Sequence, residues 1–370
     1  MKYMGSKSSM LKNGLGELIL DQCSSSNRFV DLFAGSAAVS WFVAERKSIP
    51  VISCDLQTYS YYLAEAIIGR TSPLNDKQCI AGERWIEKGF EYYLQKSSEH
   101  GLPNSKSFVL KNRALSDSSK FLLVRAYGGH YYSYAQASLF RYLLSILPED
   151  RILRKVLVAS LIEAASNCAA APGHTAQPFQ PSNNGLKAIN DAWMKNPMDV
   201  IQTKFDFFKN KFALSQGEAI VCNALDFTAN MKEGDLVFLD PPYSGVHYSR
   251  FYHVLESFAR GGINSYSGTG RYPEPKDRPK SDFSLRGKST ASMSSLLQNI
   301  ASKKATAIIT FPNGKCSNGL SGELIKDISK QNFKVSKELI KGKFSTLGGN
   351  NSNRPARQES EELVLLLEPK

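Results

Sequence analysis

The sequence predicts an α/β protein, with a Rossmann-like sheet of largely parallel strands and a long, mostly helical insert. Three observations predict this fold. Short apolar runs, each too short for a helix, occur near both ends of the chain. Acidic residues follow several of these runs, as expected where ligands bind at the carboxyl ends of parallel strands. Residues 71–216 instead contain helix-like runs separated by clusters of Gly, Pro, Asn and Ser.

The first predicted unit is a strand, a turn and a helix within residues 29–43. An apolar run, Phe29 to Phe33, meets the small residues Ala34 to Ala37, and a helical pattern follows. Such a turn lets a cofactor approach the backbone at a helix N-terminus, although the full GxGxxG spacing is absent. The next strand, Val51 to Cys54, ends at Asp55, twenty positions beyond Gly35. At that spacing a carboxylate can accept a ribose hydroxyl, so the two strands together predict a nucleoside cofactor.

The insert contains one stretch, Arg125 to Gln136, in which aromatic residues, glycines, an amide and basic groups alternate. This mixture favours stacking on bases and contacts with base edges, with Arg125, Tyr134 and Gln136 as the candidate residues. The alternative is an aromatic helix and turn that pack in the insert's own core.

The sheet is predicted to resume at Ala219 to Cys222, with Asp226 and Phe227 close behind. The central stretch follows: an apolar strand from Asp235 to Leu239, and then Asp240-Pro241-Pro242-Tyr243. The prolines fix φ and supply no N–H, so a carboxylate, a rigid carbonyl and a flat ring stand together. This set suits a planar group that carries an NH2. The alternative is a strand that ends in a Pro-Pro turn with a solvated Asp.

Residues 261–288 form a glycine-rich and basic stretch. We expect a mobile loop that clamps a phosphate backbone through Arg271, Arg278 and Lys280, or else a solvated loop. Two further strands are predicted, from Ala305 to Phe311 and from Glu362 to Leu367, with Phe333 to Val335 between them.

Composition limits the classes of function. The chain has 370 residues, 42% hydrophobic and 22% charged, as in ordinary globular proteins. Its formal net charge of +12 indicates an anionic partner, with nucleic acid as the first candidate and a merely basic enzyme as the alternative. The six cysteines and five histidines show no metal-ligand spacing, so we expect reduced thiols and no metal. Without a signal peptide or a long apolar span, a cytoplasmic protein is expected.

The order of these parts resembles the Dam-like (alpha-group) DNA adenine-N6 methyltransferases. The resemblance rests on Lys2–Lys7 (KYMGSK), Phe29–Ser36 (FVDLFAGS), the long insert and Asp240–Tyr243 (DPPY). It implies a Rossmann-like methyltransferase sheet with a helical target-recognition insert, acting in the prokaryotic cytoplasm or nucleoid. The catalytic domain would comprise residues 1–70 and 217–370, and the insert residues 71–216.

The resemblance also implies residue roles around S-adenosyl-L-methionine. Tyr3 and Lys7 would line its site, while Phe33, Gly35 and the neighbouring backbone would hold its methionine part. Asp55 would bind the ribose hydroxyls, Asp240 would border the methyl group, and the adenine ring would contact Asp226 and Phe227. The chain departs from the family turn, Phe-x-Gly-x-Gly, by having Ala37 at the second glycine, where a positive φ would be costly.

The catalytic set implied by the resemblance is Asp240, Pro241, Pro242 and Tyr243. The target adenine would flip out of a DNA duplex, stack on Tyr243 and donate its N–H groups to Asp240 and the Pro241 carbonyl. Double-stranded DNA is the expected partner, and a cognate restriction endonuclease is expected as a separate protein. Two alternatives stay open: an RNA adenine methyltransferase, and a non-catalytic DNA-binding protein on a methyltransferase fold.

Overall fold

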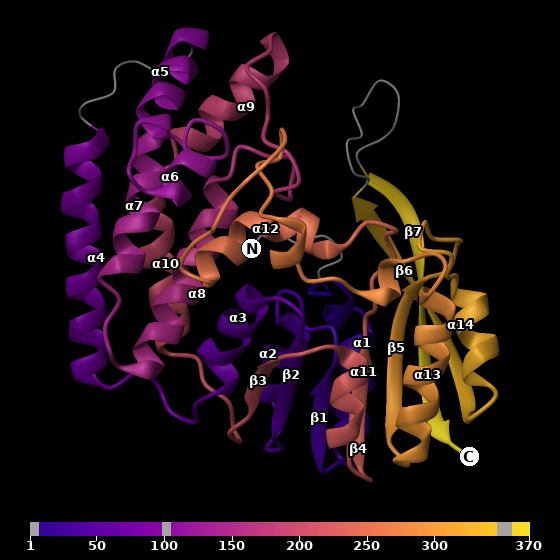
Figure 1. The fold of residues 1–370 in the computed structure, drawn as a ribbon. Helices are drawn as coiled ribbons and strands as arrows, with labels where there is room; N and C mark the ends of the chain where they lie inside the picture. The colour runs from indigo at the N-terminus through magenta and orange to yellow at the C-terminus, as the bar shows by residue number, and fades with distance from the viewer. Residues whose placement is uncertain (1–6, 98–104, 346–356) are drawn as a thin grey trace. The chain divides into compact units, whose positions relative to one another are not determined.

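The structure is a computed structural model that describes residues 7–97, 105–345 and 357–370, and of residues 337–345 and 357–361 the backbone only. The chain divides into two compact units (Figure 1). One unit is built around a sheet and contains residues 7–71, 212–248 and 279–370. The other is helical, and its described parts lie within residues 72–211 and 249–278.

The sheet of the first unit has the strand order β3-β2-β1-β4-β5-β7-β6 within the described residues. The first five strands are parallel, and β7 is antiparallel to both of its neighbours. In sheet order the strands are β3 (Glu218–Val221), β2 (Val51–Asp55), β1 (Arg28–Asp31), β4 (Asp235–Leu239), β5 (Thr306–Pro312), β7 (Arg357–Pro369) and β6 (Phe333–Ser345). The α/β fold predicted from the sequence is confirmed.

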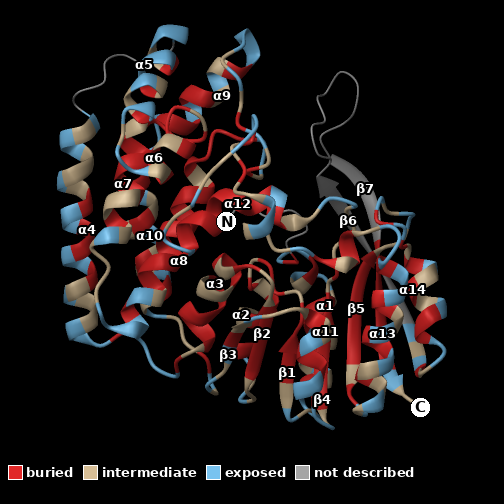
Figure 2. Ribbon diagram, viewed as in Figure 1, coloured by how far each residue is buried: buried red, intermediate tan, exposed pale blue. Residues whose placement is uncertain are grey.

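The central strands are buried on both faces, as their continuous apolar sequences require. All five residues of β4 are buried, and Figure 2 shows the middle of the sheet in the colour of buried residues. Register aligns Asp31 of β1 with Ser53 of β2 and with Phe238 of β4. Because these strands are parallel, their carboxyl ends lie at one edge, where Asp31, Asp55 and Asp240 stand.

Helices pack on the sheet from both sides. One hydrophobic cluster joins side chains of β1, β2, β4 and β5 to those of α11, α13 and α14. Another set of contacts joins α2 to β1 and β2, and α3 to β2 and β3. The helical segments of this unit are η1 (Met10–Lys12), α1 (Leu15–Cys23), α2 (Ala38–Ala44), α3 (Thr58–Ile68), α11 (Ala224–Phe227), η2 (Thr228–Asn230), η4 (Asp282–Ser284), α13 (Ser289–Ser302) and α14 (Gly322–Ser329).

Several helices of the second unit begin at residues whose side chains cap them. Ser133 and Gln136 form a capping box at the start of α7, and Asp150 caps α8. Within the described residues, no helix of either unit is long and apolar enough to cross a membrane. The helices are α4 (Asp76–Ser97), α5 (Lys106–Asp117), α6 (Leu122–Tyr127), α7 (Tyr134–Ser145), α8 (Arg151–Cys168), α9 (Asn183–Trp193), α10 (Pro197–Lys209), α12 (Tyr248–Ala259) and η3 (Pro275–Asp277).

One segment differs from the predicted domain boundaries. Residues 249–278 group with the helical unit, whereas the sequence placed them in the catalytic domain with the rest of residues 217–370. Buried hydrogen bonds explain the difference, because the Tyr127 hydroxyl pairs with Ser257 at 2.7 Å and Thr175 donates to the Phe251 carbonyl at 2.9 Å. These partners lie far apart in sequence, so no local pattern predicts their contacts.

Candidate active site

Asp240 follows β4 directly, and one of its carboxylate oxygens is held by two donors. The Lys7 ammonium lies 3.0 Å from Asp240 Oδ1, and the Thr310 hydroxyl of β5 donates to the same oxygen at 3.1 Å. Within the described residues, Oδ2 has no such partner. The carboxylate is therefore fixed in orientation, with one oxygen left to accept hydrogen bonds from another molecule.

Lys7 also contacts a second carboxylate. Its side chain is 4% exposed, and Nζ lies 3.1 Å from Oε2 and 3.3 Å from Oε1 of Glu362 on β7. The antiparallel pairing of β5 and β7 sets Glu362 opposite Pro312, close to Thr310. Sequence reasoning missed both Glu362 and Thr310, because each lies inside a strand and far from Asp240 in sequence.

The charges in this cluster oppose one another. Burial raises the pKa of Asp240 to about 6, the Lys7 ammonium lowers it, and the charge of Glu362 raises it. Burial alone would lower the pKa of Lys7, but the charges of Asp240 and Glu362 outweigh burial, and the pKa is raised. Lys7 is therefore a cation, and Asp240 is mainly ionised above pH 7.

The residues after Asp240 are held in place by Asn318, whose side chain is fully buried. Its amide donates to the Pro242 carbonyl at 2.6 Å and to the Phe283 carbonyl at 3.0 Å. The Pro242 carbonyl is thus occupied. The half-buried ring of Tyr243 packs against the hydrophobic cluster and meets Tyr248 edge-on at 6.2 Å. Burial raises the pKa of Tyr243 to about 12, so its hydroxyl stays protonated.

The turn between β1 and α2 has two residues with positive φ. Gly35 has φ +51° and Ala37 has φ +60°, so Ala37 adopts the conformation that the family glycine would favour. The Gly35 N–H donates to Asp55 Oδ2 at 2.8 Å, and the Gln57 N–H donates to Oδ1 at 2.9 Å. Asp55 therefore ties the carboxyl end of β2 to this turn, and its contact with a ribose stays a prediction.

Asp31, at the end of β1, is a further site residue that sequence reasoning missed. It is 1% exposed, Oδ2 accepts a hydrogen bond from Ser40 at 2.7 Å, and Oδ1 has no partner among the described residues. Burial raises the pKa of Asp31 to about 7. The hydrogen bonds from Ser40 and from the Phe33 backbone lower it, and the charges of Asp240 and Asp55 raise it. An unpaired buried oxygen of this kind is suited to an external donor or cation.

The other predicted cofactor residues have varied surroundings. Phe33 is half-buried and meets Phe283 edge-on at 5.2 Å, whereas Phe227 is buried in the hydrophobic cluster. Asp226 is exposed on α11. Tyr3 lies outside the described residues. The contacts of these four residues with a cofactor stay predictions.

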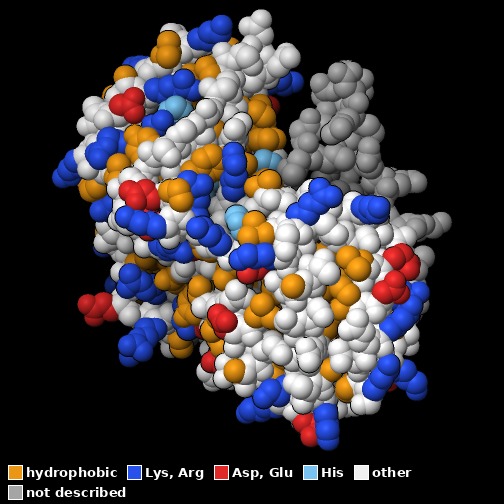
Figure 3. Space-filling view, turned by 45° about the vertical axis from the view of Figure 1, so that its right-hand side comes forward, with side chains coloured by type: hydrophobic (Ala, Val, Ile, Leu, Met, Phe, Trp, Pro, Cys, Tyr) orange, Lys and Arg blue, Asp and Glu red, His pale blue; other side chains and the backbone are white. Residues whose placement is uncertain are grey.

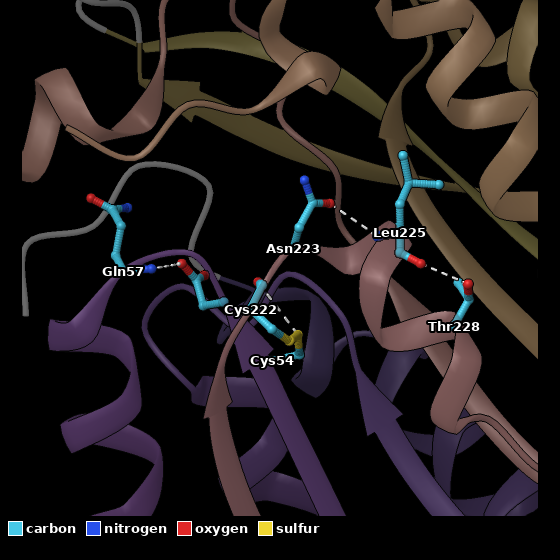
Figure 4. Close-up of a disulfide and its surroundings, with 7 residues drawn as sticks. Cys54, Gln57, Cys222, Asn223, Leu225 and Thr228 are labelled. Atoms are coloured by element: carbon cyan, nitrogen blue, oxygen red, sulfur yellow. Dashed lines mark hydrogen bonds between the residues drawn. A yellow bond between two sulfur atoms is a disulfide. The ribbon is translucent and has the colours of Figure 1, made fainter. Parts of the chain in front are cut away.

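Two cysteines at this edge form a disulfide. Cys54 of β2 is bonded to Cys222, the residue after β3, beside Gln57 and Asn223 (Figure 4). The expectation that all six cysteines are thiols is therefore wrong for this pair. Parallel pairing sets Cys54 opposite Ile220, which brings the two Cα atoms to 6.1 Å, within the range that a disulfide spans. A sequence separation of 168 residues hides this proximity from any local pattern.

The predicted base-reading stretch mainly forms the core of the helical unit. Tyr127, Tyr131 and Tyr132 are fully buried, as the alternative interpretation of this stretch required. Gln136 is fully buried too, and its amide donates to three backbone carbonyls, at residues 192, 193 and 195. The prediction that Gln136 contacts a base edge is corrected, since its hydrogen-bonding groups are already used within the unit.

Arg271 also makes its hydrogen bonds within the helical unit. Its guanidinium donates to the carbonyls of Arg125 and Ala126 and lies 4.5 Å from the centroid of the Tyr266 ring. It holds the end of α6, so we no longer assign it a phosphate contact.

The other predicted DNA-binding residues differ in exposure. Tyr134 and Arg278 are half-buried, and Lys280 is exposed. The Arg125 guanidinium donates to the Ser119 carbonyl at 2.6 Å, and that of Arg278 donates to the Pro273 carbonyl at 2.8 Å. Their contacts with DNA stay predictions.

The strand order, the turn after β1 and the Asp-Pro-Pro-Tyr segment after β4 together define a Rossmann-like methyltransferase. The family model described as D12 class N6 adenine-specific DNA methyltransferase matches residues 3–269. The chain belongs to this family. Methyltransferases of this class use S-adenosylmethionine as the methyl donor.

Two curated relatives are modification methylases. The chain is 25% identical over 315 residues to "Modification methylase StsI" of Streptococcus sanguinis, which covers 82% of this chain and 42% of the relative. It is 25% identical over 295 residues to "Modification methylase LlaI" of Lactococcus lactis subsp. lactis, covering 77% and 41%. The chain thus spans about two fifths of the length of either relative.

The residues at the sheet edge fit S-adenosylmethionine. This cofactor carries an ammonium group, and the unpaired Asp31 Oδ1 is a buried anionic acceptor for such a group. Each Asp55 oxygen accepts one backbone N–H, which fixes the carboxylate at the carboxyl end of β2, and its contact with a ribose hydroxyl stays a prediction. A cofactor bound at the turn of Gly35 and Ala37 would meet main chain and small side chains, as the sequence predicts.

Proposed function

We propose that this chain transfers a methyl group from S-adenosylmethionine to the exocyclic N6 of adenine in a specific sequence of duplex DNA. The observation that carries the proposal is the half-anchored Asp240 carboxylate. Lys7 and Thr310 hold Oδ1, and Oδ2 has no partner within the part of the chain that the structure describes. Family membership supports the same activity.

The chemistry needs a better nucleophile than a free adenine offers, because the N6 lone pair is delocalised into the ring. Asp240 Oδ2 and the Pro241 carbonyl would accept the two N–H bonds and draw the nitrogen towards tetrahedral geometry. S-adenosylmethionine supplies an electrophilic methyl on its sulfonium. The N6 lone pair would bond to this methyl group as the bond from carbon to sulfur breaks, and Asp240 would accept the released N6 proton.

The target base must leave the duplex to reach Asp240, because the sheet edge cannot enter a base stack. Tyr243 would stack on the extruded adenine, since its neutral ring is only half-buried. We assign sequence recognition to the helical unit and propose Arg125, Tyr134 and Arg278 as its DNA contacts. On the face drawn in Figure 3, Lys and Arg side chains outnumber those of Asp and Glu, which favours a polyanionic substrate.

The names of the two relatives support a role in DNA modification. A modification methyltransferase protects a sequence that a restriction endonuclease cuts. We therefore propose a cognate endonuclease, as a separate protein, that recognises the same site.

The proposed function is tested by Asp240→Asn, which keeps the shape of the side chain and removes its charge. Transfer of labelled methyl to duplex DNA should fall at least about a hundred-fold, the usual effect of losing a group that stabilises the transition state. The fold should survive, because Lys7 keeps its ion pair with Glu362. Asp327→Asn, at an exposed acid on α14, is the matched control and should change nothing.

Three outcomes count against the proposal. Substantial turnover by D240N would remove Asp240 from the chemistry. Faster methylation of an RNA duplex than of DNA of the same sequence would make RNA the substrate. DNA binding by the unaltered chain without any transfer would indicate a non-catalytic binding protein. The target sequence itself would come from sequencing methylated adenines in the DNA of an expressing host.

A further inference from the structure

Lys7 is a single buried cation that serves two carboxylates, Asp240 and Glu362, so this cluster carries one excess negative charge when both are ionised. A lysine placed only to neutralise Asp240 would need no second acid. The proposed mechanism assigns Glu362 no contact with substrate or cofactor. Burying a further carboxylate is expensive, so its presence calls for a physical reason.

We propose that Glu362 is a positioning residue for Asp240: it holds the Lys7 ammonium at Oδ1 and offsets the lysine charge, so that Oδ2 stays free and basic towards the adenine N6. This inference rests on the proposed function and adds Glu362 and Lys7 to its machinery.

The geometry supports the positioning role. Lys7 Nζ has three N–H donors, and the ammonium sits 3.0 Å from Asp240 Oδ1 and 3.1 and 3.3 Å from the two oxygens of Glu362. Donors directed at Glu362 cannot bind Asp240 Oδ2 at the same time. Without Glu362, the flexible lysine can turn both remaining donors towards Asp240 and compete with the substrate amine for Oδ2.

Removing the charge of Glu362 and removing the charge of Lys7 should shift the pKa of Asp240 in opposite directions. The groups facing Asp240 are Lys7 from the N-terminal segment, Glu362 of β7, Thr310 of β5, Asp31 of β1 and Tyr243 after β4. Thr310 and Tyr243 are neutral, and Asp31 is a further acid. Removing the charge of Glu362 makes Asp240 a weaker base, whereas removing the charge of Lys7 makes it a stronger base.

The test is the pH dependence of single-turnover methyl transfer, measured with saturating S-adenosylmethionine and duplex DNA. The acid limb is the part of the pH–rate profile in which the rate rises as Asp240 loses its proton. In E362Q this limb should move to lower pH by about one unit, and in K7M to higher pH by about one unit. E362Q should also be about ten-fold slower on the pH plateau, because Oδ2 is no longer reserved for the amine. E362D keeps the charge and should leave the acid limb where the wild type has it.

A merely structural role for Glu362 would slow E362Q without moving its acid limb, and that result overturns the inference. If E362Q does not fold, the inference is tested by comparing K7M with K7M/E362Q. The double variant removes the charges of Lys7 and Glu362 together. Its acid limb should lie about one unit below that of K7M. If the acid limbs of K7M and K7M/E362Q lie at the same pH, the inference is overturned. Failure of the proposed function looks different, because the unaltered chain itself would then transfer no methyl to DNA.

Discussion

Asp31, Asp55 and Asp240 end or follow neighbouring parallel strands, yet their surroundings give them different chemistry. Both oxygens of Asp55 accept backbone N–H groups. Among the described residues, Asp240 has partners at one oxygen only, and one oxygen of Asp31 has none. The sequence revealed Asp55 and Asp240, because each follows an apolar run. Asp31 stands inside the run FVDLF, so its strand-end position was hidden.

Glu362 and Thr310 show what a sequence cannot display at the scale of a residue. Their contact with the Asp240 cluster depends on β7 inserting beside β5, and Lys7 and Glu362 are 355 positions apart. No spacing rule connects such residues. Only the folded sheet identifies them as part of the candidate site.

Cofactor affinity should depend on pH through Asp31. Its folded-state pKa of about 7 lies above the ordinary value, so the carboxyl is mainly protonated and neutral below pH 7. The cofactor ammonium favours the ionised form, and binding should therefore weaken about ten-fold between pH 8 and pH 6. Calorimetric titration of S-adenosylmethionine across this range measures the effect.

The variant D31N supplies the comparison for that measurement. It should bind the cofactor weakly and with little dependence on pH, whereas D327N should behave as the wild type does. A pH dependence in D31N equal to that of the wild type would show that another group titrates. The folded protein also holds the Asp31 proton more tightly than the unfolded chain does. The unliganded protein should therefore lose stability as pH rises through about 7.

The strand, turn and helix of residues 29–43 form the element that sequence reasoning predicted best. Its signals are local: an apolar run, small residues and a helical pattern. Ala37 has a positive φ, so the turn imposes on this alanine the conformation that glycine adopts at lower cost. Segment 249–278 was assigned to the wrong unit, because its partners are set by tertiary hydrogen bonds and not by its own pattern.

Replacing Ala37 by glycine tests how much strain the turn stores. Left-handed φ costs alanine about 1–2 kcal/mol. Glycine relieves that strain, but it adds about 0.4–1 kcal/mol of unfolded-chain entropy and loses a buried methyl worth about 0.8 kcal/mol. These effects nearly cancel, so A37G should change the free energy of unfolding by less than about 1 kcal/mol. A37V should destabilise by about 1–3 kcal/mol or more through overpacking at this fully buried site.

The matched control for A37G is A44G in α2. Ala44 is also fully buried, but it lies in a helix, where glycine costs about 1 kcal/mol beyond the lost methyl. Urea unfolding of the three variants gives the comparison. If A37G proves as destabilising as A44G, the positive φ at residue 37 stores no appreciable strain.

For the whole molecule, the order of the motifs together with the net charge predicted more than any single motif did. The net charge of +12 and the order of motifs indicated a nucleic-acid methyltransferase, and the family was confirmed. The surface that reads the target sequence was not predictable. Aromatic residues serve equally well in a hydrophobic core and on a base-stacking surface, and in residues 125–136 they mainly form a core.

Phosphate contacts near the candidate site are best sought in residues 280–286. This segment is tied to the catalytic stretch, because Asn318 bridges the Phe283 and Pro242 carbonyls and the Ser281 N–H donates to His247. Lys280 and Arg286 are exposed on it. We therefore expect DNA that delivers a base to Asp240 to pass close to these two cations.

Neutralising both, as K280Q/R286Q, should weaken binding to all duplex sequences alike, since a phosphate carries no sequence information. The log–log slope of affinity against salt should become shallower by about one to two, one for each phosphate that the protein no longer neutralises. The matched control is K304Q/K330Q. Lys304 and Lys330 precede β5 and β6, so they stand at the amino ends of these strands, at the opposite edge of the sheet. A changed preference for target sites with an unaltered salt slope would place sequence recognition, and not phosphate binding, at residues 280–286.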